Sequence, residues 1–261
     1  MRIEIGGISI NYECIGSGAP VLLLHGWGAD IAAMMPIANE VARLGKMAVC
    51  VDFPGFGKSD LPPAAWGVRE YADTTKALID KLGIRGCDLV CHSFGGRVTI
   101  MLAAEDETLF KRLVLVDAAG IRPKRTIKYY IKTYSYKLAK RLARIKLVNK
   151  AFRLDSKIKS AGSDEYKSLS GVMRETFVKV VNLDLTDKLD KIKNETLLIW
   201  GGKRHRNTAL YGEANGEENR ASRSGGYREC GAFQLCGRLS AFLLHSRYNA
   251  YGLTEVLRWR Y

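Results

Sequence analysis

The stretch CDLVCHSFGG, residues 87–96, decides the fold, because its patterning changes from strand to helix within a few residues. Residues 87–91 are apolar apart from Asp88, which predicts a short buried strand. Residues 94–104 carry apolar and small side chains in a helical pattern. Ser93 stands between them, beside small residues that let a strand and a helix approach closely. Such a turn projects a serine hydroxyl above the edge of a sheet, and Ser93 is therefore a candidate nucleophile.

Apolar runs and helical patterns alternate along the first two hundred residues. This alternation predicts a mostly parallel sheet whose strands are joined by crossover helices. The expected strands are residues 8–14, 21–24, 47–52, 87–91, 113–117 and 196–200. Helices are expected at residues 68–82 and 94–104.

Composition indicates an ordinary globular chain. Its 261 residues are 47% hydrophobic and 26% charged, which excludes a disulfide-stapled miniprotein, a collagen-like fibre and a disordered tail. Residues 2–5 are strand-like rather than part of a signal segment. The sequence contains no run of 18 uncharged apolar residues, so no membrane span is expected. Six cysteines without zinc-site spacing predict small buried residues in a reducing compartment, and hence a cytoplasmic protein without a metal site. They are Cys14, Cys50, Cys87, Cys91, Cys230 and Cys236.

Residues 121–190 interrupt the alternation with a long, basic, helical segment. Between residues 122 and 159 there are fourteen Lys and Arg against one acidic residue, Asp155. Apolar residues recur there at the spacing of an amphipathic helix: Ile127, Tyr130, Ile131, Tyr134, Leu138 and Leu142. We expect an inserted helical cap over the carboxyl edge of the sheet, with tyrosines lining an apolar pocket. These tyrosines are Tyr129, Tyr130, Tyr134 and Tyr136.

Two further motifs directly follow expected strands: HGWG at residues 25–28 and DFPGFGKSD at residues 52–60. Together with the stretch around Ser93, in this order and in these strand contexts, they resemble the α/β-hydrolase fold family. The resemblance covers about residues 1–201. It departs from the family pattern Gly-x-Ser-x-Gly at the first glycine, where this chain has Cys91, which is still a small residue.

The resemblance implies that Ser93 attacks a carbonyl carbon and that the backbone N–H groups of Trp27 and Phe94 form the oxyanion hole. It implies no metal and no organic cofactor. The implied substrate is a small carbonyl compound, by default an ester and alternatively a β-diketone-like compound cleaved at a carbon–carbon bond. His25 is expected to support the oxyanion turn rather than to act as the general base. The residues expected to support the turns are His25, Gly26 and Gly95.

A serine nucleophile needs a general base and an acid that orients this base. The resemblance implies an acid shortly after the strand at residues 196–200 and a histidine near the C-terminus in a Gly-His-Phe-like stretch. Residues 201–207, GGKRHRN, contain no carboxylate, and His245 lacks that flanking pattern. Asp117, at the end of the strand expected at residues 113–117, is the fallback acid. The other interpretation of Asp117 is a carboxylate that caps a turn.

Residues 202–261 differ in composition from the rest of the chain, with no Asp, Pro or Ile and nine Arg against one Lys. If one extra nucleotide lies near the codons of Gly201 and Gly202, the codons of residues 203–212 can be re-read as Asn-Asp-Thr-Glu-Thr-Pro-Leu-Tyr-Met. The same shift allows Ala-Gly-His-Phe-Ser-Tyr-Val-Asp at residues 230–237. An acid loop and a histidine motif are recovered in the family order, which predicts an out-of-frame tail. A divergent C-terminus is the alternative.

We therefore expect an α/β fold with a mostly parallel sheet of the α/β-hydrolase type. Its parts are a core at residues 1–120, a helical cap at 121–190, a core strand at 191–201 and a tail at 202–261 in which the last strand and helix are disrupted. The expected function is serine hydrolysis of a carbonyl compound, impaired by the loss of the acid and the histidine. The alternative is a non-catalytic, hydrolase-like scaffold that binds anionic lipid or other acidic partners through its basic cap.

The net charge of +14 taken alone suggests a nucleic-acid partner. The tail contributes ten basic and five acidic residues, and residues 122–159 of the cap carry fourteen of the remaining basic residues. Because the excess charge is concentrated in these two segments and no base-reading motif accompanies it, no nucleic-acid partner is expected. Peripheral contact of the cap with a membrane stays open.

Overall fold

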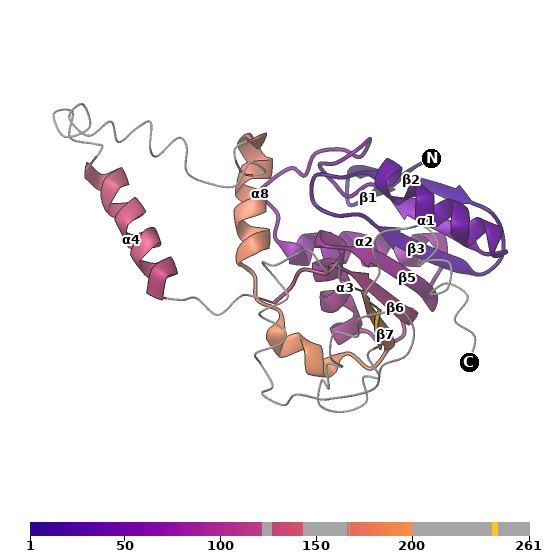
Figure 1. Ribbon diagram of the computed structural model, residues 1–261. Helices are drawn as coiled ribbons and strands as arrows, with labels where there is room; N and C mark the ends of the chain where they lie inside the picture. Colours follow the sequence, from indigo (N-terminus) through magenta and orange to yellow (C-terminus); the bar gives the residue numbers. More distant parts are fainter. Residues whose placement is uncertain (122–126, 143–165, 167, 200–241, 245–261) are drawn as a thin grey trace, which may run out of the picture.

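The computed structural model describes residues 1–121, 127–142, 166, 168–199 and 242–244 of the chain. Eight strands form one sheet in the order β1-β2-β4-β3-β5-β6-β7-β8 (Figure 1). The strands are β1 (Arg2–Ile5), β2 (Ile8–Ile15), β3 (Pro20–Leu24), β4 (Met47–Val51), β5 (Cys87–His92), β6 (Phe110–Val116), β7 (Glu195–Ile199) and β8 (Phe242–Leu244). The helices are α1 (Ile31–Arg43), α2 (Val68–Leu82), α3 (Phe94–Glu105), α4 (Ile127–Leu142), α8 (Gly171–Asn182) and the 3-10 helix η1 (Thr186–Lys191).

The mostly parallel sheet expected from the sequence is confirmed. All pairings among strands β3 to β8 are parallel, whereas the pairings of β1 with β2 and of β2 with β4 are antiparallel. The helix expected at residues 68–82 has those bounds, and β6 begins three residues before the strand expected at 113–117. The expected disruption of the last strand and helix falls outside the described residues, except for the three residues of β8, which pair with β7.

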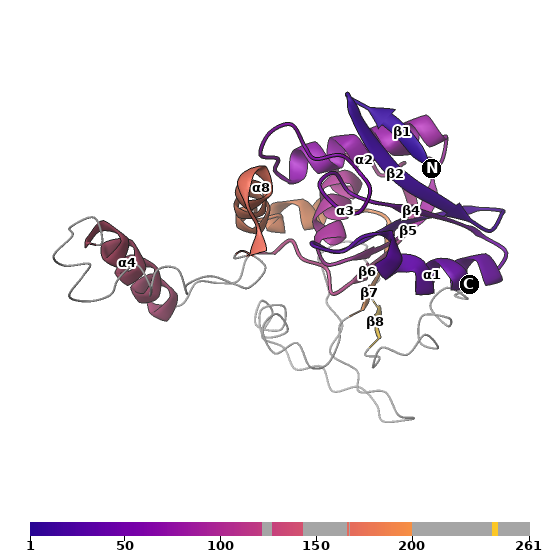
Figure 2. The ribbon, with the colours of Figure 1, turned by 90° about the horizontal axis from the view of Figure 1, so that it is seen from above.

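Helices cover both faces of the sheet, and this explains the continuous apolar runs of its strands. Figure 2 shows α2 and α3 on one side and α1 on the other. Leu22 and Leu24 of β3 lie in the core beneath α2 and α3, whereas Leu23 lies in the core beneath α1. Since successive side chains of a strand point to opposite faces, a strand buried on both faces needs apolar residues at every position.

Three of the four described cysteines follow the prediction, because Cys50, Cys87 and Cys91 are buried and free. The prediction is wrong for Cys14, which is free but exposed. β1 pairs only with residues 8–11 of β2, so Cys14 lies in the part of β2 that forms the margin of the sheet. Cys230 and Cys236 lie outside the described residues.

The segment expected to form a cap contains α4, α8 and η1 among the described residues. α8 lies against the body, where the Trp66 N–H donates a hydrogen bond to Thr176 Oγ1 at 3.0 Å. In Figures 1 and 2, α4 instead projects away from the sheet. Tyr130 and Tyr134 are exposed, so the expectation that they line a pocket is wrong for these two tyrosines. The side chains of Tyr129 and Tyr136 lie outside those described.

Gly95 makes a testable contribution to the packing of α3 against β3. A Cβ atom at this position would lie 2.8 Å from the carbonyl oxygen of Leu24 and 3.0 Å from its Cβ. Because these atoms belong to a buried central strand, Gly95→Ala is expected to lower the free energy of unfolding by about 2 kcal/mol. Urea denaturation measures this change. Gly67→Ser is the control and is expected to be nearly neutral, since a Cβ at Gly67 meets only Glu70 Oε2 at 3.4 Å and serine suits this N-cap position.

Candidate active site

Ser93 occupies a strained turn between β5 and α3. Its φ of 46° and ψ of −99° are unusual for a residue with a side chain and cost about 1 kcal/mol or more. Backbone hydrogen bonds hold the turn: the Ser93 N–H donates to Val116 O at 3.0 Å, and Ser93 O accepts from Ala119 N at 2.9 Å and Gly96 N at 3.0 Å. The turn is thereby fixed to the carboxyl end of β6. Ser93 is partly exposed, as a nucleophile must be.

Cys91 is the residue by which the turn departs from the family pattern, and it is also a possible rival nucleophile. It is completely buried in β5. Burial raises the pKa of its thiol to about 12. Since the thiolate is the reactive form of cysteine, Cys91 remains an unreactive packing residue near neutral pH.

His25 joins the loop after β3 to the loop after β4. Its ring is fully buried, with Nδ1 2.7 Å from Gly26 O, while Nε2 accepts a hydrogen bond from the Phe53 N–H at 3.0 Å. These two contacts specify a neutral ring with its proton on Nδ1. Both ring nitrogens are therefore engaged with the backbone, which is the behaviour of a residue that supports a turn.

The pH dependence of stability tests this role of His25. Burial is the main cause that lowers its pKa in the folded protein, against the opposing effect of the hydrogen bond to Gly26 O. Below about pH 6.5 the unfolded chain therefore binds a proton at His25 more readily than the folded chain does. We expect the free energy of unfolding to fall as the pH is lowered from 7 to 5, and His25→Gln to flatten this fall. Urea denaturation at each pH measures it, and an unchanged slope in the variant contradicts the assignment.

The loop that carries Gly26 and Trp27 lies directly beside the turn of Ser93. A Cβ atom on Gly26 would lie 2.6 Å from His92 Nδ1 and 3.6 Å from Ser93 Cβ, so only glycine fits without displacement. The rings of Trp27 and Phe94 are in edge contact, with centroids 5.3 Å apart. The structure thus brings together the two backbone segments from which the resemblance derives the oxyanion hole.

Asp52 holds these loops together, a role that was not predicted from the sequence. Its buried carboxylate accepts hydrogen bonds from the backbone N–H of Ile31 at 2.7 Å and of Lys58 at 2.9 Å, and from Asn11 Nδ2 at 2.8 Å. A Cβ atom on Gly57 would lie 2.2 Å from Asp52 Oδ2, which explains a glycine there. The loop after β4, the start of α1 and β2 are therefore held by one carboxylate. The motif at residues 52–60 was the available signal.

An aromatic cluster lies next to the turn of Ser93, and only its members Trp27 and Phe94 were predicted from the sequence to belong to the site. Neighbouring rings contact one another at centroid distances from 4.9 Å to 5.8 Å along the chain of contacts from Phe177 to Trp66. The members are Trp27, Phe53, Phe56, Trp66, Tyr71, Phe94 and Phe177. Trp27, Phe56 and Phe177 are partly exposed and offer an apolar surface to a ligand.

Asp117 lies at the carboxyl end of β6, as expected, and is buried. Its φ of 44° places it, like Ser93, in a conformation that side chains rarely adopt. Its backbone N–H donates to Ile199 O at 2.8 Å, and Ala119, two residues later, bonds the Ser93 backbone. Asp117 is thus at the same sheet edge as Ser93. Residues 201–207 and His245, considered as sources of the acid and the base, lie outside the described residues.

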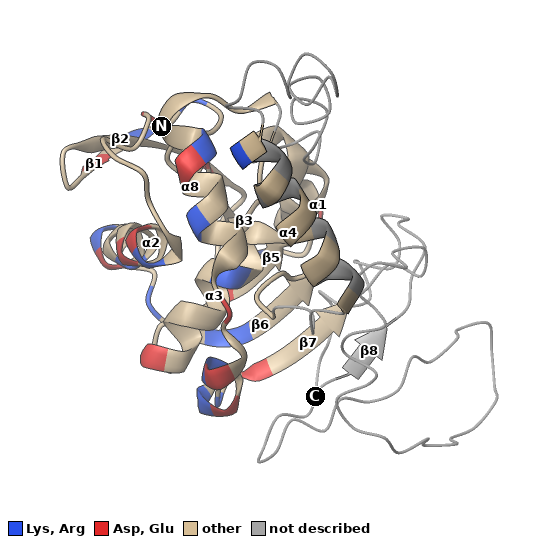
Figure 3. Cartoon of the chain, turned by 90° about the vertical axis from the view of Figure 1, so that its left-hand side faces the viewer, with Lys and Arg blue, Asp and Glu red and all other residues tan. Residues whose placement is uncertain are grey.

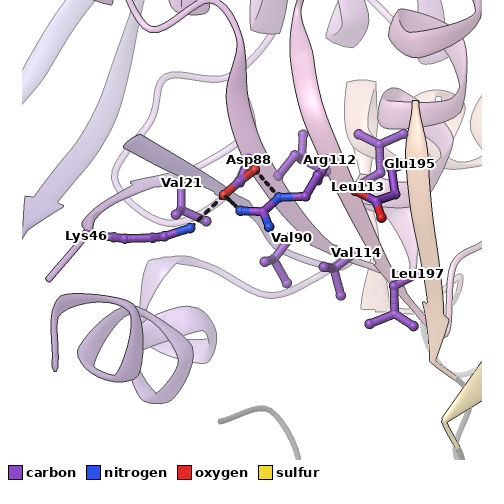
Figure 4. A pocket seen from close by; sticks show the side chains of 10 residues that line it. Val21, Lys46, Asp88, Val90, Arg112, Leu113, Val114, Glu195 and Leu197 are labelled. Carbon is purple, nitrogen blue, oxygen red and sulfur yellow. Dashed lines mark hydrogen bonds and ion pairs between the residues drawn. The ribbon is translucent and has the colours of Figure 1, made fainter. Parts of the chain in front are cut away.

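A small pocket of about 30 Å³ lies at the opposite, amino edge of β3, β5, β6 and β7. Figure 4 shows Asp88 between Lys46 and Arg112, with Lys46 Nζ 2.8 Å and Arg112 Nη2 2.6 Å from Asp88 Oδ2. Partial burial opposes ionisation of Asp88, but the hydrogen bonds from Arg112 and Lys46 outweigh it and hold the pKa below its usual range. Parallel sheets bind ligands at their carboxyl edge, so the candidate site lies at the carboxyl edge of the sheet, where Ser93 is found.

Neither a metal centre nor a membrane span is found in the described part of the chain. No group of three or more His, Cys, Asp or Glu residues there is arranged to hold a metal ion. No helix within the same residues combines the length and the hydropathy that crossing a membrane requires.

The profile of the alpha/beta hydrolase family matches residues 21–211. Among curated proteins, the 2-hydroxymuconate semialdehyde hydrolase of Pseudomonas sp. (strain CF600) is 34% identical over 124 residues, which are 46% of this chain and 44% of that protein. The 2-(acetamidomethylene)succinate hydrolase of Mesorhizobium japonicum is 33% identical over 116 residues, 44% of this chain and 41% of that protein. The alignments span less than half the length of these relatives.

Solved structures resemble the chain in fold. An esterase from Exiguobacterium antarcticum superposes with a TM-score of 0.56 and 23% identity, covering 76% of this chain and 78% of the esterase. A meta-cleavage product hydrolase from Pseudomonas fluorescens IP01 gives a TM-score of 0.53 and 22% identity, covering 77% of this chain and 79% of that structure.

Proposed function

The chain belongs to the alpha/beta hydrolase family, and we propose that it is a serine hydrolase whose nucleophile is Ser93. One observation carries this proposal. The structure holds a partly exposed serine in a strained turn at the carboxyl edge of a parallel sheet, directly beside the Gly26–Trp27 loop. Strain of this kind persists at functional sites because the surrounding structure maintains it, and here the backbone bonds from Ser93 to β6 and Ala119 do so.

In the proposed reaction, Ser93 Oγ attacks the carbonyl carbon of the substrate while a general base accepts the hydroxyl proton. The backbone N–H groups of Trp27 and Phe94 stabilise the oxyanion of the tetrahedral intermediate. The base returns its proton to the leaving group, and an acyl-enzyme remains. Water then attacks the acyl carbon by the same route and frees Ser93. His25, Gly26 and Gly95 hold the turns, and no cofactor takes part.

We propose that the base and its acid are encoded in the shifted frame of residues 202–261, so that the chain as written is impaired. Support comes from the composition of this segment and from the two family motifs that are restored when one nucleotide is removed. Asp117 remains the fallback acid, supported by its position at the same edge of the sheet as Ser93. The division into a core at residues 1–120, a cap at 121–190 and a core strand at 191–201 belongs to the same proposal.

The proposed substrate is a small carbonyl compound with an apolar acyl portion. The partly exposed rings of Trp27, Phe56 and Phe177 support an apolar acyl site. The relatives include an esterase and a hydrolase of a semialdehyde, so an ester and a carbon–carbon bond next to a carbonyl are both within the proposal. The buried free thiols of Cys50, Cys87 and Cys91 support a reducing, cytoplasmic location.

The experiment is to measure hydrolysis of p-nitrophenyl acetate, butyrate and octanoate, and of a β-diketone, by two proteins. One is the chain as written, and the other is its frame-restored form, in which one nucleotide near the codons of Gly201 and Gly202 is deleted. Ser93-dependent turnover of one class identifies the bond that is cleaved. Turnover of none of these compounds by the frame-restored form, in a folded protein, contradicts the proposal.

A further inference from the structure

Helix α4 exposes a continuous apolar face. Ile127, Ile131 and Leu138 are 79%, 64% and 58% exposed, respectively. Their spacing of four and seven residues places them on one side of the helix. Tyr130, Tyr134 and Leu142 are also exposed and belong to the same side. Figures 1 and 2 agree in showing α4 projecting from the body that contains the sheet.

Among the described helices, α1 and α2 bury their apolar faces, and α8 exposes only the smaller side chains of Val178 and Val181 on its apolar side. In α1, Val41 and Ala38 are fully buried against the sheet, and in α2, Leu78 and Ile79 are buried in the core. An exposed row of large aliphatic side chains loses the free energy of burial that these helices gain, and contiguous apolar patches mark interaction sites. The apolar face of α4 therefore indicates contact with something outside the described core.

The charge of α4 identifies the chemistry of that contact. Its sixteen residues include five basic residues and no acidic residue. The basic residues are Lys128, Lys132, Lys137, Lys140 and Arg141. In Figure 3, no described residue of α4 is coloured as Asp or Glu, whereas α8 contains residues of both signs. The longer segment 122–159, which includes α4, contains fourteen basic residues and one acidic residue, Asp155. The partner must therefore offer both an apolar and an anionic surface.

We propose that α4 docks in the plane of an anionic membrane surface, with its apolar face in the lipid–water interface. A helix with a basic polar side, an aliphatic side and low overall hydropathy is typical of this mode of binding. Anionic headgroups attract the lysines, and the acyl boundary takes up the isoleucines and leucines. A second copy of the chain would bring like charges together, and a nucleic acid would leave the aliphatic side exposed. α4 rises about 24 Å, which suits a helix lying on the surface.

The test uses the full chain and vesicles of phosphatidylcholine, alone or with 30% phosphatidylserine, in a sedimentation assay. We expect the partition coefficient on the anionic vesicles to exceed that on neutral vesicles at least about tenfold, and to fall as salt is added. The variant Ile127→Ser/Ile131→Ser/Leu138→Ser is expected to bind the anionic vesicles about 100-fold more weakly. Leu61→Ser, which removes a leucine 67% exposed outside α4, is expected to bind normally.

A second pair of variants separates local charge from net charge. Lys132→Glu/Lys140→Glu is expected to weaken binding about tenfold or more, whereas Lys111→Glu/Lys191→Glu changes the net charge equally on exposed residues outside α4 and is expected to have little effect. Equal binding of the chain to neutral and anionic vesicles overturns the proposal. An equal loss of vesicle binding in the two double charge variants, inside and outside α4, overturns it as well. So does a change of oligomeric state in the α4 variants without vesicle binding, or salt-sensitive binding of RNA in its place. Vesicle binding needs no turnover, so its failure is independent of Ser93.

Discussion

Ser93→Ala is expected to lower kcat/KM for p-nitrophenyl butyrate by about 10,000-fold or more in the frame-restored protein. The strained turn presents one hydroxyl to the carbonyl carbon, and no described neighbour replaces it, because Cys91 is buried with a raised pKa. Removing the nucleophile of a serine hydrolase leaves only the stabilisation by the oxyanion hole and by binding. Steady-state ester hydrolysis measures the loss.

The matched control is Ser17→Ala, which changes an exposed serine in the connection between β2 and β3. Its activity should equal that of the unsubstituted protein. Circular dichroism spectra that superpose for all three proteins show that the loss at Ser93 is chemical. Retention of more than a tenth of the activity in Ser93→Ala contradicts the assignment of the nucleophile.

Deleting one nucleotide near the codons of Gly201 and Gly202 is expected to raise ester hydrolysis about 1,000-fold or more above that of the chain as written. In the proposed function, the restored frame supplies the base that accepts the Ser93 proton and the acid that orients this base. Members of such a triad act as a unit, so their joint recovery produces the full gain. The measurement compares the two purified proteins on one ester.

Deletion of three nucleotides at the same place is the control, because it removes one residue but keeps the frame of the tail. It should leave the activity low. The frame proposal is wrong if the gene sequence around codons 200–204 contains no single deletion that opens one frame with both motifs. It is also wrong if the restored protein is folded but no more active.

Much of the core was predictable because it depends on local patterns. Strands buried on both faces are apolar at nearly every position, and the segments at β3 and β4 could therefore be recognised from the sequence. The turn at Ser93 was predictable because a strand, a serine and glycines follow one another within a few residues. The exposure of Cys14 was not, since it depends on how far β1 extends along β2.

The parts of the site that escaped prediction are made by residues distant in sequence. Asp52 acts through Asn11, Ile31 and Lys58, which only the finished sheet brings to one point. The aromatic cluster likewise joins Trp27 to Phe177 across 150 residues of chain. Periodicity predicted the amphipathic pattern of α4 but not whether its apolar side meets the core, because pattern alone does not specify the partner of a face.

Covalent labelling tests most directly whether Ser93 is the nucleophile that this fold presents. The frame-restored protein is incubated with a fluorophosphonate, and the intact mass and the labelled peptide are determined by mass spectrometry. We predict a single adduct on the peptide that contains Ser93, complete loss of esterase activity with labelling, and no adduct in Ser93→Ala. An adduct on another residue, or equal labelling of the Ser93→Ala protein, would contradict the proposed role of this turn.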